Sequence, residues 1–396
     1  MSTGNVHSPR TGGPAQSVPK QRTSFERRRF LKASLAAVGS AGALAEALWA
    51  APPEEAGGSH NSEKAAEDLD KLPMRVGLGQ FSELTDERMA FVKQCGVEDI
   101  VLNTPKLPGE KRWEYEVLLA LNTRAREAGL RLVSIENVPI SFYDKIMLGL
   151  PGRDEQLENM RHTVRNIGRA GIPIFGYHFM PNSVWRTAPR TVRGGAVATA
   201  FKLDEARKRP LSFGRRYSED QMWDNYDWYL ERILPDCEEA GVRLALHPDD
   251  PPVAELGGVA RLFWNFENFK RAMEVHDSPM HGLDFCHGCW SEMRGGAGVL
   301  EAIRFFGERG RLFYVHLRDV QGTADDFTEC WLGEGNCNIL ETMRTLKEVG
   351  FRGIMLTDHV PHMPGDTPWG HRGRAYTVGY MKALLQVLES KPAGES

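Results

Sequence analysis

The sequence predicts an α/β fold, specifically a (β/α)8 TIM barrel, on the basis of three observations. From Met74 onward, short apolar runs alternate with longer amphipathic segments, the pattern of strands alternating with helices. There are eight such runs, the number of strands that closes this barrel. The steps from helix to strand are short and contain glycine, as in AGLRL, AGIPI, AGVRL and VGFRG, which favours a parallel sheet.

Each apolar run has the length of a buried strand. In chain order the predicted strands are RVGL (75–78), DIVLN (99–103), RLVSIE (131–136), PIFGYHF (173–179), VRLALH (242–247), HGLDFC (281–286), FYVHL (313–317) and GIMLTD (353–358). Helical periodicity marks DERMAFVKQCG (86–96), YEVLLALNTRAREAG (115–129) and ILETMRTLKEVG (339–350), and the last two end in glycine, as helices often do. A doubly wound sheet is the alternative, but it usually has fewer strands and a glycine-rich phosphate loop. The sequence contains no GxGxxG or Walker pattern.

The first 45 residues are predicted to be a signal peptide rather than part of the fold. RRRFLKA (27–33) resembles the twin-arginine export motif, and LAAVGSAGALA (35–45) follows it and ends in a plausible cleavage site. This apolar stretch is too short for a stable membrane span. A disordered basic tail is the alternative. The signal predicts a periplasmic or exported protein, which stays cytoplasmic if the signal is unused.

The rest of the chain divides by composition. Residues 46–72 form a predicted polar linker, and residues 73–390 the catalytic barrel. A polar insertion at about 182–218, after the fourth strand, is predicted to form a lid or an oligomer contact.

Composition excludes several functional classes. With 41% hydrophobic and 26% charged residues, the chain can bury a large core. A net charge of -4 without a long basic run beyond the N-terminus argues against nucleic-acid binding. Six cysteines are too few for a disulfide scaffold in a chain of 396 residues. No second CxxC accompanies Cys286 and Cys289, so a four-cysteine zinc ribbon is excluded.

Four consecutive predicted strands end in a residue that can bind a metal. These residues are His247, Cys286, His316 and Asp358. Active-site groups of such barrels lie at the C-terminal ends of the strands. A single histidine there is more often structural and a buried cysteine is usually a small apolar residue, but four in register indicate a divalent metal site. Imidazole, carboxylate and one thiolate suit Mn²⁺, Fe²⁺ or Zn²⁺.

The same strand-end rule distinguishes the two cysteines of the CxxC in GLDFCHGCW (282–290). Cys286 ends the strand and is the predicted ligand, whereas Cys289 is predicted to point away from the rim. A redox dithiol is disfavoured because the segment lacks thioredoxin-like order.

Polar residues near the strand ends are candidates for holding a substrate. His178 ends the fourth strand, and Asn182, Trp185 and Arg186 follow in its loop. Arg186 could bind a carboxylate with two hydrogen bonds, although a solvated loop arginine is the alternative. Arg318, just past His316, is a substrate-binding candidate or a member of a structural ion pair.

Several segments together resemble the mannonate dehydratase family. They are FMPNSVWRT (179–187), HPDDPP (247–252), LDFCHGCWSEM (283–293), YVHLRDV (314–320) and VGFRGIMLTDH (349–359), within a resemblance from about Met74 to Leu388. The resemblance implies a xylose-isomerase-like barrel, a homodimer, and a hydro-lyase of hexuronate catabolism that depends on Mn²⁺ or Fe²⁺. Its substrate would be the sugar acid D-mannonate, and its products 2-keto-3-deoxy-D-gluconate and water. The family's metal ligands match His247, Cys286, His316 and Asp358.

The reaction also needs groups that move protons. A base must take the proton from C2, and an acid must protonate the leaving hydroxyl group. His359 is family-matched and is the first candidate; the alternative is that it only supports the metal ligands. The family carries a tyrosine in a Pro-Gly-Tyr segment where this chain has PWGHRGRAYTVGY (368–380), so Tyr376 is the second candidate, with Tyr380 as the alternative. VPISFYDK (138–145) also departs from the family, which places His and Glu after Val-Pro.

Two other functions are compatible with the sequence. A metal-dependent sugar isomerase or epimerase would use the same barrel, but such sites commonly lack a cysteine ligand. A non-catalytic sugar-acid binding protein could have lost the tyrosine segment. Turnover is the observation that identifies the binding protein, which a sugar acid would stabilise without being changed.

Overall fold

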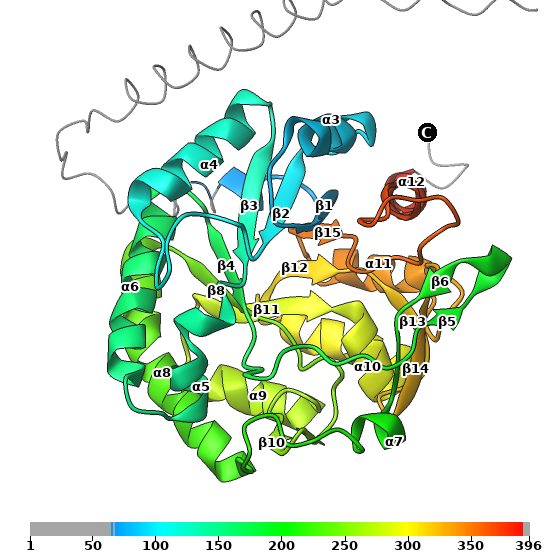
Figure 1. Ribbon diagram of the computed structural model, residues 1–396. Helices are drawn as coiled ribbons and strands as arrows, with labels where there is room; N and C mark the ends of the chain where they lie inside the picture. The colour runs from blue at the N-terminus through cyan, green and yellow to red at the C-terminus, as the bar shows by residue number, and fades with distance from the viewer. Residues whose placement is uncertain (1–64, 66–67, 391–396) are drawn as a thin grey trace, which may run out of the picture. The chain divides into compact units, whose positions relative to one another are not determined.

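The computed structural model describes residue 65 and residues 68–390, and its centre is a closed barrel of eight parallel strands (Figure 1). The strands are β1 (Arg75–Phe81), β2 (Asp99–Asn103), β3 (Arg131–Glu136), β4 (Ile174–Tyr177), β8 (Arg243–Leu246), β11 (His281–Cys286), β12 (Leu312–His316) and β15 (Ile354–Leu356). Each pairs with its neighbours in barrel order, and β1 closes the ring by pairing with both β2 and β15. The predicted barrel and its eight strands are confirmed.

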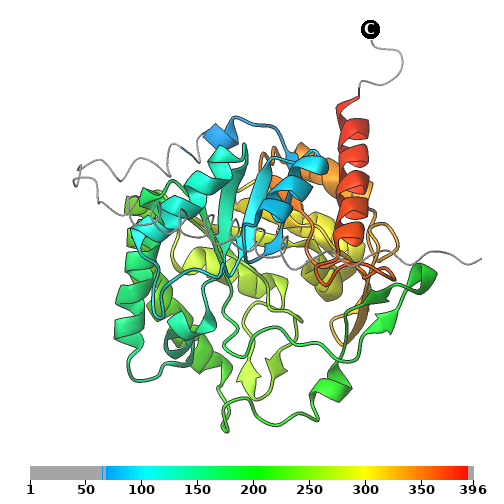
Figure 2. The same ribbon diagram turned by 45° about the horizontal axis from the view of Figure 1, so that its top comes forward.

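Helices surround the barrel on the outside (Figures 1 and 2). The longer ones are α3 (Asp86–Gln94), α4 (Tyr115–Glu127), α6 (Arg153–Arg169), α8 (Glu219–Ala240), α9 (Phe266–Val275), α10 (His287–Gly307), α11 (Ile339–Glu348) and α12 (His371–Glu389). The three predicted helices correspond to α3, α4 and α11. Gly129 and Gly350, just past α4 and α11, have φ of 75°, the left-handed conformation that ends a helix and favours glycine.

The inside of the barrel holds a small apolar cluster that determines where the mouth begins. Its members are Val101, Val133, Ile174, Ala245, Phe313, Tyr314, Ile354 and Leu356. Side chains two residues apart on a strand point to the same face. The residues two positions beyond Val101, Ala245, Tyr314 and Leu356 therefore also face the barrel axis, one layer closer to the mouth. They are Asn103, His247, His316 and Asp358.

The insertion after β4 contains little regular structure and packs against a distant hairpin. It includes β5 (Arg190–Thr191), β6 (Val197–Ala198), β7 (Ala200–Lys202) and the short α7 (Leu203–Ala206). β7 pairs antiparallel with β14 (Asp326–Cys330), which pairs with β13 (Asp319–Thr323). Phe201 and Phe327 stack between these strands with ring centroids 5.9 Å apart. The insertion is thus attached to the hairpin that follows β12.

Short elements complete the described chain. They are α5 (Asp144–Leu148), the turns of 3₁₀ helix at Ile140–Phe142 and Arg193–Gly195, and a hairpin of β9 (Glu255–Leu256) with β10 (Val259–Ala260). The predicted signal peptide at 1–45 and most of the predicted linker at 46–72 lie outside the described residues. No helix among residues 68–390 combines the length and apolar character needed to span a membrane.

Candidate metal centre and active-site cavity

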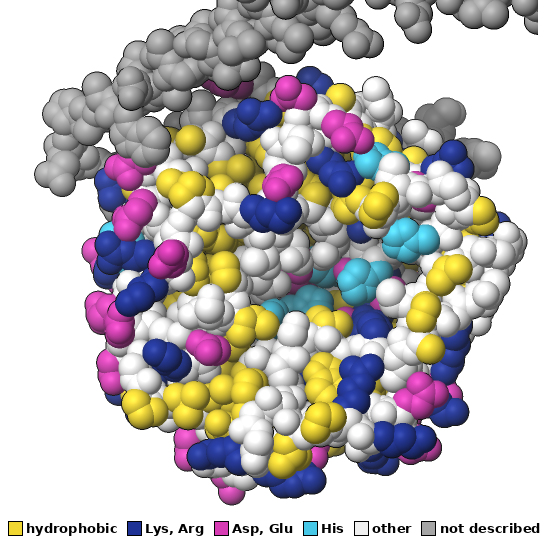
Figure 3. Space-filling model, viewed as in Figure 1, with side chains coloured by type: hydrophobic (Ala, Val, Ile, Leu, Met, Phe, Trp, Pro, Cys, Tyr) yellow, Lys and Arg dark blue, Asp and Glu magenta, His cyan; other side chains and the backbone are white. Residues whose placement is uncertain are grey.

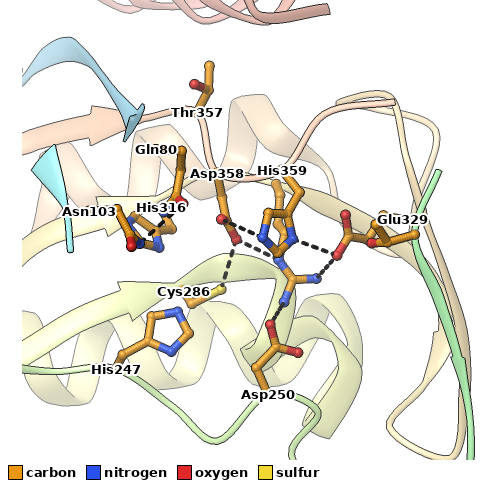
Figure 4. Close-up of polar contacts among 12 residues, drawn as sticks. Gln80, Asn103, His247, Asp250, Cys286, His316, Glu329, Thr357, Asp358 and His359 are labelled. Atoms are coloured by element: carbon orange, nitrogen blue, oxygen red, sulfur yellow. Dashed lines mark hydrogen bonds and ion pairs between the residues drawn. The ribbon is translucent and has the colours of Figure 1, made fainter. Parts of the chain in front are cut away.

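The barrel gathers the four predicted metal ligands at one point of its mouth (Figure 4). Cys286 and His316 are register partners on β11 and β12, while His247 directly follows β8 and Asp358 follows β15 after one residue. Ligand atoms of Cys286, His316 and Asp358 all lie within 4.8 Å of one another, and the same holds for His247, Asp284 and His316. All these residues are buried. The sequence-based register therefore brings the four side chains together in space.

The donor atoms are suited to a divalent metal ion. Neither ring nitrogen of His316 and neither carboxylate oxygen of Asp284 makes a well-directed hydrogen bond, although Nε2 of His316 lies 2.9 Å from Oε2 of Glu136 and Nδ1 lies 3.7 Å from Oδ1 of Asp284. Leaving a buried polar atom unpaired costs about 1–3 kcal/mol, so such a group points to a missing partner. Two imidazoles, a thiolate and a carboxylate form a set that binds Mn²⁺, Fe²⁺ or Zn²⁺. The residues present fit such an ion.

The surroundings of Cys286 favour the form of the side chain that binds metal. Burial by itself would raise the pKa of the thiol. The neighbouring Cys289, the positive charge of Arg318 and the imidazoles of His247 and His316 outweigh burial and hold the pKa well below its usual value. The thiolate is the metal ligand. The surroundings of Cys286 therefore favour the ionised form that could bind a metal ion.

Cys289 and Arg318 lie directly behind the ligands. Cys289 was predicted to point away from the rim, and this is wrong: its sulfur lies within 4.8 Å of ligand atoms of both His247 and Cys286. The reason is that α10 begins immediately after Cys286, so a residue three positions on returns to the same side. The Cys289 sulfur lies 3.1 Å from Nη2 of Arg318. Cys289 therefore belongs to a buried layer of charged residues beneath the predicted metal centre, made of Arg318, Asp250, Glu292 and Asp358.

Arg318 holds this layer together. Its Nε donates to Oδ2 of Asp358 at 2.8 Å, and its Nη1 donates to Oε1 of Glu292 at 2.7 Å. Nη2 lies 3.3 Å from Oδ2 of Asp250. The guanidinium is buried and does not line the cavity described below. The structure thus places Arg318 where it orients Asp358, the predicted metal ligand, and not where it would touch a molecule in the cavity.

Gly288 makes room for this arginine. A Cβ atom at position 288 would lie 2.7 Å from both Cζ and Nε of Arg318. We expect Gly288→Ala to lower the free energy of unfolding by about 1–3 kcal/mol, because the buried guanidinium must shift away from its carboxylates. Gly379→Ala in α12 is the control, since nothing lies within 4 Å of its Cβ position. Denaturant titration of both variants checks the prediction, and equal stability of the two would contradict it.

A cavity of about 300 Å³ opens beside the metal ligands. Figure 3 shows a hollow on this face, with histidine side chains in and beside it. Residues from six strand ends line the cavity: Gln80, Asn103, Thr104, Glu136, Asn137, Val138, Ile140, His178, Met180, Ser183, Val184, His247, Asp250, Asp358 and His359. Most are polar, which suits a small ligand with many hydroxyl groups.

His359 lines the cavity and has a carboxylate partner on its outer side. Its Nδ1 donates to Oε1 of Glu329 at 3.0 Å, and its Nε2 lies 3.6 Å from Oδ1 of Asp358 (Figure 4). Burial opposes the charged ring, but the two carboxylates outweigh burial and raise the pKa of His359 above its usual value. Because Nδ1–H is held by Glu329, the neutral ring has its lone pair on Nε2. His359 is therefore arranged to accept a proton on Nε2.

The chain is similar to known proteins over most of its length. The family model described as D-mannonate dehydratase (UxuA) matches residues 80–209 and 198–393. The chain belongs to the mannonate dehydratase family. It is 30% identical over 325 residues to the mannonate dehydratase of Thermotoga maritima, an alignment covering 73% of this chain and 88% of the relative. The members of this family are named for a hydro-lyase reaction, the removal of water from mannonate.

Solved structures support the same assignment. The crystal structure of mannonate dehydratase from Streptococcus suis serotype 2 superposes with a TM-score of 0.70 at 26% identity, covering 81% of this chain and 97% of that one. A xylose isomerase domain protein from Alicyclobacillus acidocaldarius subsp. acidocaldarius, at 12% identity and a TM-score of 0.54, covers 80% of this chain and 100% of its own. This second match shows the shared fold alone.

In this member of the mannonate dehydratase family, His178 is the predicted substrate-binding residue that lines the cavity. Burial, together with the nearby His247 and Arg261, lowers the pKa of His178 to about 3, so the ring is neutral. Its Nδ1 accepts a hydrogen bond from the backbone N–H of Met180 at 3.2 Å. Nε2 therefore carries the proton, and a neutral donor is available at the cavity wall.

The other predicted substrate contacts stabilise the loop after β4 instead. Asn182 donates to the carbonyl of Leu256 at 2.9 Å, and Trp185 donates to the carbonyl of Asn182 at 3.0 Å. Arg186 binds both oxygens of Asp250, at 2.7 and 2.8 Å, and also Glu329 at 2.9 Å. These three side chains do not line the cavity. The hydrogen bonds of these three side chains are therefore made within the protein, whereas Ser183 and Val184 of the same loop line the cavity.

Tyr376, the second predicted proton carrier, also lies outside the cavity. It stands on α12 and is 38% exposed, with its hydroxyl 3.4 Å from Nη2 of Arg193 and its ring against Trp331. The segment that departs from the family pattern therefore does not bring this hydroxyl into the cavity. Tyr380 stands on the same helix, and its ring lies 6.3 Å from that of Tyr376.

Sequence reasoning missed the polar wall formed by the ends of β1, β2 and β3. Glu136 accepts a hydrogen bond from Asn103 at 2.9 Å through Oε1, while its Oε2 lies 2.9 Å from Nε2 of His316. Gln80 lies beside them, with its Nε2 3.4 Å from Glu136. The strand-end rule that found the metal ligands also identifies these residues. Asp284 could be found by alternation, since it stands two residues before Cys286 on the same strand face.

Proposed function

We propose that the protein dehydrates D-mannonate, or a closely related aldonate, to 2-keto-3-deoxy-D-gluconate with one divalent metal ion. His247, Cys286, His316 and Asp358 would hold the ion. The observation that carries the proposal is the convergence of these side chains beside a polar cavity of about 300 Å³, in a chain of the mannonate dehydratase family. The volume lies at the lower end of the range for small-molecule sites.

The chemistry requires removal of a weakly acidic proton next to a carboxylate. A bound divalent ion would act as a Lewis acid toward the carboxylate and the neighbouring hydroxyl, stabilising the negative charge that develops. His359 would take the C2 proton on Nε2 while Glu329 orients its ring through Nδ1. The C2–H electron pair then forms the C2–C3 double bond as the C3–O bond breaks. The departing hydroxide would take up a proton from the His359 ring or from solvent and leave as water, and the resulting enol becomes the 2-keto acid.

The remaining residues would position the substrate. His178, neutral and with its proton on Nε2, would donate a hydrogen bond to a substrate oxygen. Arg318 would keep Asp358 oriented from behind. Tyr376 is not included in the proposed machinery, because its hydroxyl contacts Arg193 outside the cavity.

A product assay tests this function. The purified protein is loaded anaerobically with Mn²⁺ and given D-mannonate, and the 2-keto-3-deoxy acid is measured by chromatography and mass. A product lighter by one water supports the proposal. A product of unchanged mass but changed structure would indicate an isomerase or epimerase, and recovery of the unchanged acid with measurable binding would indicate a non-catalytic binding protein. Either of these results would overturn the proposal.

Removal of the metal is a second test. We expect dialysis against a chelator to abolish activity and lower the melting temperature, and added Mn²⁺ or Fe²⁺ to restore both. At a free metal concentration of one hundred times Kd, binding adds about 2.7 kcal/mol to the stability of the folded state. Activity that persists with metal removed, as measured by elemental analysis, would argue against a metal-dependent reaction.

We also propose that residues 1–45 direct export by the twin-arginine route and that the barrel, residues 73–390, acts as a homodimer after export. The support is the RRRFLKA pattern and the resemblance to the family. Replacing residues 27–29 by lysine is expected to retain the protein in the cytoplasm. Cell fractionation and light scattering of the purified chain test the two statements separately.

A further inference from the structure

The cavity mouth is built from unusual backbone conformations. Among the described residues, those with positive φ other than glycine are Gln80, Thr104, Asn137 and Ser183, with φ of 63°, 38°, 66° and 62°. Every one of them lines the cavity. Residues with a Cβ atom seldom adopt this conformation, and where they do the surrounding structure holds them in place, often at a functional site.

These four residues belong to one side of the barrel. Gln80 lies at the end of β1, Thr104 and Asn137 directly follow β2 and β3, and Ser183 lies in the loop after β4; these four strands are consecutive in the barrel. The proposed metal ligands come from β8, β11, β12 and β15, which are also consecutive. The cavity therefore has a metal wall and, on the other half of the ring, a wall of amide and hydroxyl side chains.

Asn137 is the member of this second wall whose side chain has an unused acceptor. Its backbone N–H donates to the carbonyl of Gly176 at 2.7 Å, which fixes its position. Its Oδ1 is buried and has no hydrogen-bonding partner. Gln80 and Asn103, in contrast, are both engaged with Glu136. A buried acceptor without a partner, on a cavity wall, is in place for a donor from a ligand.

We propose that Asn137 is a specificity-determining residue that accepts a hydrogen bond, through Oδ1, from a hydroxyl group of the substrate beyond C4. The inference rests on the proposed function, in which the carboxylate and C2 hydroxyl occupy the metal wall. The remainder of a six-carbon acid then extends toward the ends of β1 to β4. Asn137 would thus distinguish long sugar acids from short ones without taking part in the proton transfers.

The Asn137→Gly variant tests the proposal, because glycine keeps the left-handed backbone and removes only the amide. KM and kcat are measured for D-mannonate and for a four-carbon aldonate with the same configuration at C2 and C3. We expect KM for D-mannonate to rise about tenfold with kcat within twofold, the size of one lost hydrogen bond. The four-carbon acid should show no change beyond twofold. Ser141→Ala, at an exposed residue outside the cavity lining, is the control and should match the wild type.

Two results would overturn the proposal. One is an equal rise in KM for both acids, and the other is an unchanged KM for both. Melting temperature and metal content identify a variant that has merely lost its structure. Asn137→Ala, which also removes Oδ1 and leaves the backbone less free than glycine does, then replaces it. If the wild type dehydrates no aldonate, calorimetric titration of the Mn²⁺-loaded protein with the two acids decides the question. If the variant binds D-mannonate more weakly than the wild type does but binds the four-carbon acid equally well, the role of Asn137 is supported although the proposed reaction is not. If the variant and the wild type bind each acid with the same affinity, the role of Asn137 is rejected.

Discussion

The Cys286→Ser variant is expected to lose its divalent metal and its dehydratase activity together. A serine hydroxyl stays protonated at neutral pH. The pKa of the Cys286 thiol, in contrast, is held low by the neighbouring Cys289, by Arg318 and by the two histidines, which favours the thiolate. A bound metal stabilises the transition state by several kcal/mol, and about 4 kcal/mol corresponds to roughly a thousandfold in kcat. Elemental analysis of the purified variant and the product assay measure the two losses.

Cys289→Ser provides a matched control from the same CxxC. Its hydroxyl retains an acceptor for Nη2 of Arg318, which lies 3.1 Å from the natural sulfur. This variant should keep its metal and most of its activity. Full metal occupancy in Cys286→Ser would remove Cys286 from the ligand set, and loss of metal in Cys289→Ser would move the assignment to the second thiol. His316→Ala should behave like Cys286→Ser.

Arg318→Met is expected to cost about 3–5 kcal/mol in the free energy of unfolding of the metal-free protein. Methionine fills much of the volume but leaves the carboxylates of Glu292, Asp250 and Asp358 in the interior without their shared cation. Uncompensated buried charge is far more costly than a lost surface pair. Guanidinium denaturation followed by circular dichroism measures the change, and metal titration shows whether Asp358 still serves as a ligand.

Arg216→Met is the control for this variant. Arg216 pairs with Glu255 at 2.6 Å, but both side chains are largely exposed, so the expected change is below about 1 kcal/mol. Arg318→Lys should recover part of the stability, because it restores the charge without the planar fork that reaches several partners. A loss in Arg318→Met no larger than that in Arg216→Met would show that the buried carboxylates are not held by this arginine.

The barrel and the clustering of the four proposed metal ligands could be predicted from the sequence because both depend on local spacing. Strand and helix periods alternate eight times, and parallel strands in a closed barrel bring their C-terminal ends to one rim. His247, Cys286, His316 and Asp358 follow from that register. Gln80, Asn103 and Glu136 follow from the same rule, although ordinary amide and carboxylate residues at strand ends carry no distinctive signal by themselves.

Other parts of the site depend on contacts that spacing does not reveal. Arg186 turns away from the cavity because it binds Asp250 and Glu329, and Glu329 lies on β14, more than a hundred residues away in the chain. Cys289 faces the site because α10 begins directly after Cys286, although Gly288 is a poor helix former. Glycine is needed at position 288 because a side chain there would clash with Arg318, which is distant in the sequence but adjacent in space.

The division of the rim into two consecutive halves has an evolutionary consequence. The strands that gather the metal ligands come from the later part of the chain, and those with the amide and hydroxyl wall come from the earlier part. Under the role proposed for Asn137, mutations in the wall of amide and hydroxyl side chains would alter which acid is accepted while the four proposed metal ligands stay unchanged. A protein with this barrel could evolve to use a different sugar acid by substitution of a few residues such as Asn137, while the reaction type stays the same.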